Sequence, residues 1–287
     1  MTNELSPTEL AAEVVENWRP RFVSRFYEMN RVIPRVLNAT GDFKQKGDIA
    51  HIEVEGFDLT VNSVAADGSL TVQTQTLTDV QVVINANKDV TMEWTGISME
   101  QALGQWKNQF PTSAGNALRQ KIELDLLAEY SNATLTAVGE AAGGANLGED
   151  EILAAIQQHV DAKGPIMDSP EQYTFALASS QFGPLKKARL LDYERTGEAG
   201  EGGAASMKIG KLFNVPVIFS TQVATSSSVR KSLLFHETAL AWAAQRNVEP
   251  RFADRLAAAK DSYIGTVLAL YGVKTVVGAR MCVINSK

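Results

Sequence analysis

The longest stretch with a helical repeat of apolar positions is Ser98–Ser131. Apolar or aromatic residues recur there every four positions, at Leu118, Ile122, Leu126 and Tyr130. This spacing places them on one face, which predicts a helix with one buried side. Ser98 followed by Gln101 is typical of a capping box, in which each side chain satisfies a backbone amide at the helix start.

Pro111 interrupts this predicted helix near its middle. Proline has no amide hydrogen to donate, and its ring collides with the carbonyl one turn earlier. We therefore predict a bend or break between Gln109 and Ser113, with Thr112 or Ser113 capping the second helical segment.

Between Asp42 and Trp94 the pattern indicates strands instead. Apolar and polar residues alternate in short runs, which is typical of half-buried strands. The expected strands are His51–Val54, Leu59–Val64, Leu70–Thr76, Val80–Ile84 and Val90–Trp94. Asp67-Gly68 is suited to a tight hairpin turn. Because threonine and glutamine are abundant here, the hairpin has little apolar surface of its own and must pack on its own body or on another subunit.

The remaining chain mixes helices and strands without regular alternation, which predicts an α+β fold. Helices are expected at Ser6–Phe26, Glu149–Ala162, Gln181–Leu191 and Leu233–Gln245. Strands are expected at Tyr173–Ala178, at Val215–Phe219 with Pro216 at an edge or strand start, at Tyr263–Leu270, at Val273–Val277 after a turn at Gly272, and at Met281–Ile284. The segments Ala137–Gly148 and Thr196–Ser206 are rich in glycine and alanine, which indicates connecting loops.

Composition excludes several classes of protein. A chain of 287 residues can bury a large core, as one large domain or two of ordinary size. Its formal charge of −6 argues against a dedicated nucleic-acid binder. We expect a soluble protein made in a cytoplasm, because no apolar run reaches the length of a membrane span and the first residues do not form a signal peptide.

Charge is unevenly distributed near the N-terminus. The first sixteen residues carry four glutamates and no base, whereas residues 17–46 carry seven bases and two acids. This segregation is typical of an arm that docks on an acidic surface or contacts nucleic acid, and equally of a solvated helix face.

Candidate chemistry is sparse. The three histidines, His51, His159 and His236, are far apart and form no metal-binding motif. His236-Glu237 is expected at a helix start, on the surface or as a cap. Cys282 lies in an apolar run and is expected to be a buried hydrophobic residue rather than a nucleophile.

The glycine-containing segments also offer no site. Gly200–Ala205 fits a dinucleotide-binding spacing but follows no strand and lies beside two glutamates, and Gly210-Lys211 lacks the upstream glycine of a phosphate loop. Glu149–Glu151 suits a helix N-terminus. We therefore predict no catalytic residue, no cofactor-binding residue, no metal ligand, no cofactor and no enzymatic activity.

The order of elements resembles the major capsid proteins of tailed double-stranded DNA bacteriophages, which share the fold of phage HK97. Two passages carry the resemblance most directly: Leu234–Ala243, similar to a helix late in the axial domain, and Ser262–Ile284, similar to the closing strands. The resemblance implies an N-terminal arm (residues 1–39), an extended β-hairpin called the E-loop (40–97), a peripheral domain with a spine helix (98–136), an axial domain (137–252) and closing peripheral strands (253–287).

The function implied by this resemblance is shell building. Such proteins form hexamers and pentamers that close into an icosahedral shell around packaged DNA, with which contact is weak and nonspecific. Implied partners are further copies of the chain, a portal, decoration proteins and, because the chain goes almost straight into the arm, a separate scaffolding protein; no membrane is involved. The implied location is the virion, with assembly in the host cytoplasm.

Three alternatives remain open at this point. An encapsulin-like shell shares the fold but encloses enzymes, so the nucleic acid in purified particles distinguishes it. A cytoplasmic α/β enzyme would stay monomeric and bind a small metabolite. A nucleic-acid-binding module would use the basic arm, with an affinity sensitive to salt and to Arg19, Arg21 and Arg25.

Overall fold

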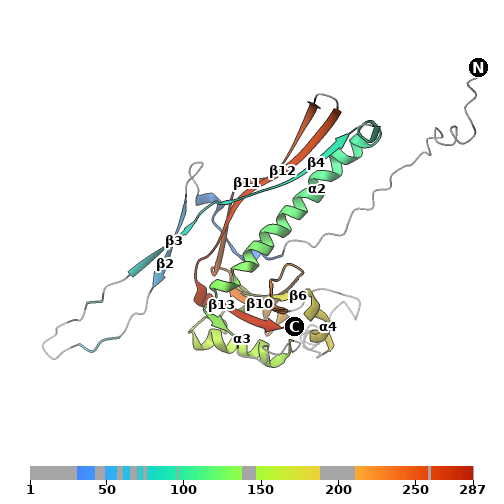
Figure 1. Ribbon diagram of the computed structural model, residues 1–287. Helices are drawn as coiled ribbons and strands as arrows, with labels where there is room; N and C mark the ends of the chain where they lie inside the picture. Colours follow the sequence, from blue (N-terminus) through green and yellow to red (C-terminus); the bar gives the residue numbers. More distant parts are fainter. Residues whose placement is uncertain are drawn as a thin grey trace, which may run out of the picture.

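We describe the fold from a computed structural model, for residues 31–42, 49–56, 61–64, 70, 72–73, 76–95, 97–137, 147–187, 211–257 and 260–286. The molecule is elongated: a long helix and three long strands extend side by side away from a compact body, and a separate hairpin projects from the base of those strands (Figure 1). Helices and strands are mixed, which confirms the α+β prediction.

The long helix α2 spans Ile97–Ala128 and is followed by a 3₁₀ turn, Glu129–Asn132. The predicted break at Pro111 is wrong, because α2 continues through this residue as one helix (Figure 1). Phe110 and Ala114 are both buried in the main core, so packing on either side of the proline offsets the intrinsic cost of about 3 kcal/mol. Ser98 is also not the cap, since the helix starts one residue earlier.

A four-stranded sheet lies along α2, in the order β1 (Leu37–Asn38), β11 (Leu240–Ala257), β12 (Lys260–Thr275), β4 (Ala86–Thr95). β12 is antiparallel to both of its neighbours, β11 and β4. The expected turn at Gly272 is wrong, because β12 runs through this residue. Gly272 instead allows a close backbone approach: a Cβ at this position would lie 2.2 Å from the carbonyl oxygen of Val83.

The expected helix at Leu233–Gln245 is also wrong. This segment forms the end of β10 (Val229–His236), a turn and the start of β11. Burial in β11 alternates: Ala241 and Ala243 join a small cluster at the base of the projecting hairpin, whereas Trp242 and Ala244 pack against the main core. Alanine has the highest intrinsic helix propensity, but propensity is a weak preference, and pairing inside two sheets overrides it.

A seven-stranded sheet forms the body, in the order β5 (Leu135–Thr136), β13 (Met281–Ser286), β10, β6 (Tyr173–Ala178), β8 (Val215–Ser220), β7 (Lys211–Leu212). Its seventh strand, β9 (Thr225–Ser226), pairs with β10. Each face of this sheet has its own core. On one face, helix α3 (Glu149–Asp161) packs in a core that holds Phe175 and Leu177. On the other face, the C-terminal half of α2 packs in a core that holds Ala176 and Ala178.

The predictions for Tyr173–Ala178 and for the helix after Glu149 are confirmed. Pro216 is the second residue of β8, at the strand start as expected. Helix α4 (Phe182–Lys187) falls within the expected Gln181–Leu191, whose last residues lie outside the described ones. The remaining 3₁₀ turns are η1 (Ile33–Arg35), η2 (Thr40–Asp42), η5 (Pro170–Gln172), η6 (Ser179–Gln181) and η7 (Gly278–Arg280).

The projecting hairpin comprises β2 (Ala50–Gly56) and β3 (Thr76–Val82), paired antiparallel, together with residues 61–64, 70 and 72–73, which lie between the two strands in the sequence. The expected strand at Leu59–Val64 is wrong for residues 61–64, which have no strand pairing, and Leu70, Val72 and Gln73 likewise lie before β3 begins. The helix expected at Ser6–Phe26, the Asp67-Gly68 turn, the Thr196–Ser206 loop and most of Ala137–Gly148 lie outside the described residues. None of the helices in the described ranges is long and apolar enough to cross a membrane.

Candidate functional site

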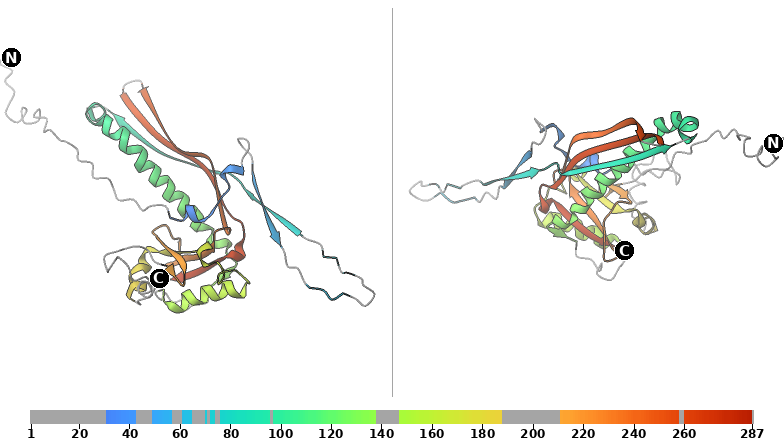
Figure 2. Two further views of the ribbon diagram at one scale, coloured as in Figure 1. Left: turned by 180° about the vertical axis from the view of Figure 1, so that it is seen from behind. Right: turned by 45° about the horizontal axis from the view of Figure 1, so that its top comes forward.

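The most distinctive surface is the projecting hairpin, which leaves the molecule at the level where β4 and β11 meet the body (Figure 2). Its large apolar side chains are exposed, at Val61, Val64, Leu70, Val72 and Leu77 and at Val83 just beyond β3. Val61 and Val72 are almost as accessible as in an extended chain, at 102% and 88%. Apolar side chains grouped on a projecting element are typical of a contact with another protein.

The base of this hairpin is firmly attached. Ala50 of β2 and Val82 of β3 are buried. They form a small core with Ala39, Ala241 and Ala243. The short alanine side chains bring the hairpin close to β11, and Gly272 does the same for β12. The hairpin is therefore packed against the body at its base, whereas its large apolar side chains farther out are exposed to solvent.

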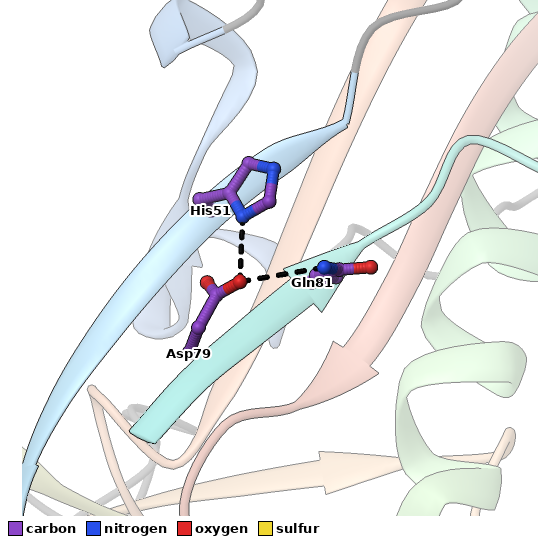
Figure 3. A network of polar contacts seen from close by, with 3 residues as sticks. All are labelled: His51, Asp79 and Gln81. Carbon is purple, nitrogen blue, oxygen red and sulfur yellow. Dashed lines mark hydrogen bonds and ion pairs between the residues drawn. The ribbon is translucent and has the colours of Figure 1, made fainter. Parts of the chain in front are cut away.

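A polar network lies on the hairpin between His51, Asp79 and Gln81 (Figure 3). The Nδ1 atom of His51 lies 2.7 Å from Asp79 Oδ2, and Gln81 Nε2 donates to the same oxygen over 3.3 Å. The His51 hydrogen bond lowers the pKa of the Asp79 carboxyl. His51 is paired directly with Gln81 across the ladder, so the network supports the register of β2 and β3 on an exposed surface.

Two of the three histidines meet in the body, although they are 77 positions apart in sequence. The ring of Tyr173 lies edge-on to both, with centroids 5.1 Å from His159 and 4.9 Å from His236. Burial lowers the pKa of His159 to about 4, and its Nε2 lies 3.3 Å from the Leu234 carbonyl. Because the Tyr173 ring lies against both imidazoles, this arrangement is a packed core rather than a ligand set.

The helix start expected at His236-Glu237 is wrong, and of the two residues Glu237 is exposed as expected whereas His236 is not. His236 ends β10 and is largely buried, with its Nδ1 2.9 Å from Thr238 Oγ1 and its Nε2 3.1 Å from Gln172 Oε1. Nothing in the local sequence indicates this, because Gln172 belongs to a distant turn. Cys282 is buried as predicted, and burial raises the pKa of its thiol to about 12.

Carboxylates on α2 and on the 3₁₀ turn that follows it connect this part of the chain to both sheets. The buried Glu123 accepts a hydrogen bond of 2.7 Å from Ser220 at the end of β8. Asp125 accepts one of 2.6 Å from the hydroxyl of Tyr271 on β12. Burial and this hydrogen bond raise the pKa of Tyr271. Glu129 accepts a further bond of 2.8 Å from the hydroxyl of Thr275.

These contacts are structural, and they show no arrangement suited to catalysis. Across the described part of the chain, no group of three or more histidine, cysteine, aspartate or glutamate residues could hold a metal ion. The glycine segment Gly200–Ala205 lies outside the described residues, as does Gly210. The acidic residues Glu149–Glu151 form the first turn of α3, as expected.

Comparison with solved structures gives matches over nearly the whole chain. A structure from Mycobacterium phage Che8 matches with a TM-score of 0.70 and 17% identity, over 99% of this chain and 98% of that one. The capsid structure of the cyanophage P-SCSP1u matches with a TM-score of 0.67 and 12% identity, over 100% and 97%. The mature capsid of bacteriophage PhiM1 matches with a TM-score of 0.63 and 13% identity, over 92% and 89%.

No protein-family model matches the chain, and no curated protein does. The structural matches are therefore the evidence for the fold of this chain, and at sequence identities of 12–17% they show the fold alone. The chain has the fold of phage capsid proteins.

Proposed function

We propose that this chain is a major capsid protein of a tailed phage, a structural protein that assembles with copies of itself into a closed icosahedral shell around packaged DNA. The observation that carries this proposal is the match to phage capsid structures along almost their full length as well as its own. The projecting hairpin supports it, because its exposed valines and leucines have no partner within the described part of the chain.

The physical basis of assembly is burial of this hairpin against a neighbouring copy. Fully burying one valine or leucine side chain contributes about 1.5–3 kcal/mol before the cost of association. Two of the hairpin's exposed side chains, Val61 and Val72, contribute almost nothing to the stability of the isolated chain. Since every copy in a shell repeats the same contact, a modest interface suffices for a closed particle.

We assign the segments on the same basis. Residues 1–39 are the arm, 40–97 the E-loop, 98–136 the spine-helix part, 137–252 the axial domain and 253–287 the closing strands. The pairing of β13 with β10 joins the last of these segments to the sheet of the axial segment. A scaffolding protein, a portal and decoration proteins are the partners that we propose from the resemblance, with the virion as the location and the host cytoplasm as the place of assembly.

The test is a double replacement on the hairpin, Val61→Ser with Val72→Ser. Both side chains are exposed in the isolated chain, so the variant should fold like the unmodified protein and keep its circular dichroism spectrum. We expect its sedimentation profile to lose the shell-sized species. Asn62→Ser, at an exposed polar position beside Val61, is the matched control and should assemble normally.

Three outcomes would contradict the proposal. Unmodified protein that remains monomeric at high concentration would refute a shell protein altogether. Shells that form equally well from the valine variant would refute the role of the hairpin. Purified particles that contain packaged enzymes and no DNA would instead identify an encapsulin-like compartment.

A further inference from the structure

A strained turn at the edge of the seven-stranded sheet places an aromatic side chain on the surface. Phe213 and Asn214 connect β7 to β8, and Leu212 pairs directly with Val215, so the loop has two residues. Both loop residues have positive φ, 51° for Phe213 and 62° for Asn214. Positive φ at both positions is what a tight hairpin of this length needs.

Phenylalanine is poorly suited to this position. Its Cβ is crowded in the left-handed region, whereas glycine and asparagine tolerate that conformation. The second loop position holds the expected kind of residue, Asn214, but the first does not. A bulky residue kept in a strained backbone is a reason to look for a function of its side chain.

The side chain of Phe213 is also not a member of the buried core beside it. It remains 43% exposed, while its neighbours Leu212 and Val215 are buried in the core under α3. The turn lies at the end of the sheet order, where β7 has β8 as its neighbour. Phe213 is therefore an exposed aromatic residue on a tight two-residue turn at the outer edge of the body.

A second turn of the chain provides a matched comparison. Ser227 and Ser228 connect β9 to β10 in another two-residue loop, with φ of 52° and 65°. Both serines are exposed. This turn has the same length and positive φ values but places no aromatic side chain outside.

From these observations we infer that Phe213 is an anchor for contact between copies of this chain, inserting into an apolar pocket of a neighbouring subunit around the capsomer. The inference rests on the proposed shell function. Aromatic residues, phenylalanine included, are enriched in the buried cores of protein interfaces. A second copy fits better than DNA, because Phe213 is an apolar group and Lys211 is the one charged residue within two positions of it in the sequence.

The test is Phe213→Asn, with Ser227→Asn as the matched control. Asparagine suits the left-handed region, so relief of backbone strain should offset the reduced packing of the half-exposed ring. The melting temperature of dissociated subunits should therefore change by no more than about 2 °C. We expect the concentration needed for assembly to rise about tenfold for Phe213→Asn. Phe213→Tyr should restore assembly, and Ser227→Asn should leave it unchanged.

Unaltered assembly of Phe213→Asn, with unmodified protein forming shells, would overturn this inference alone. Failure of the unmodified protein to form shells would overturn the proposed function instead. Hydroxyl-radical labelling of the unmodified protein is a second test, which does not depend on whether a variant folds. Phe213 should be protected in intact shells relative to dissociated subunits, and equal labelling in both would also overturn the inference.

Discussion

Gly272→Ala tests how closely the projecting hairpin is attached to the body. A Cβ on residue 272 would lie 2.2 Å from the carbonyl oxygen of Val83, 2.9 Å from its carbonyl carbon and 3.2 Å from the Cα of Ile84. All three atoms belong to the backbone, so no side-chain rotation can relieve the contact. The segment between β3 and β4 would have to move by about 1 Å, which corresponds to overpacking of about 3 kcal/mol.

Part of this cost is offset. Alanine restricts the unfolded chain more than glycine and returns about 0.4–1 kcal/mol. The net loss is therefore about 2 kcal/mol, or about 5 °C in melting temperature for a chain of this size. Because the segment that moves carries the hairpin, we also expect weaker assembly than this loss of stability alone would produce.

The assay is urea unfolding of dissociated subunits followed by circular dichroism, with sedimentation of the assembled protein. Gly183→Ala in α4 is the control, since no atom lies within 4 Å of the added carbon, and it should be neutral or slightly stabilising. An unfolding midpoint for Gly272→Ala equal to that of the unmodified protein would refute the close approach of β12 to Val83.

Three further predictions concern stability. Tyr271→Phe removes the 2.6 Å hydrogen bond to Asp125 and should lower the free energy of unfolding by about 1–3 kcal/mol in a urea titration; no change would show that this bond is weak. Since the pKa of His159 falls from 6.5 to about 4 on folding, the neutral form is favoured, stability is complete above pH 6.5, and about 3 kcal/mol is lost as the pH falls to 4. His159→Asn should flatten this decline, and an equally steep decline in the variant would contradict the assignment to His159. Pro111→Ala should raise the melting temperature, because α2 is continuous there and proline costs about 3 kcal/mol in a helix; a lower melting temperature would show that the ring is needed for packing.

Local patterns predicted the isolated elements well. The four-residue repeat of Leu118, Ile122 and Leu126 corresponds to buried positions of α2, and α3 and β6 lie where their patterns place them. These elements bury one face or both faces in a way that the local sequence reflects directly. The order of elements along the chain also indicated the phage capsid fold.

Tertiary context decided the elements that the sequence did not predict. The alanines of Ala239–Ala244 suggested a helix, but the small side chains of Ala241 and Ala243 allow close packing of β11 against the projecting hairpin. Gly272 suggested a turn, because glycine is common in turns. In the structure its lack of a side chain instead permits the close approach of the Val83 backbone. Pro111 indicated a break, but buried neighbours hold α2 together.

The candidate site was likewise predictable from the sequence only in part. The many threonines and glutamines of the hairpin showed that it has little apolar surface of its own, and this indicated that the hairpin needs a partner. The meeting of His159, Tyr173 and His236 was not visible, because their contacts join three separate elements. The strained turn at Phe213 was equally hidden, since its signal is a backbone angle rather than a residue pattern.

Electron cryomicroscopy of particles assembled from the purified full-length chain tests the shell function most directly. We expect closed icosahedral shells in which the exposed valines of the projecting hairpin, Val61 and Val72, are buried against a neighbouring copy. Monomers that do not associate at high concentration, or shells in which the hairpin remains bare in solvent, would contradict this expectation.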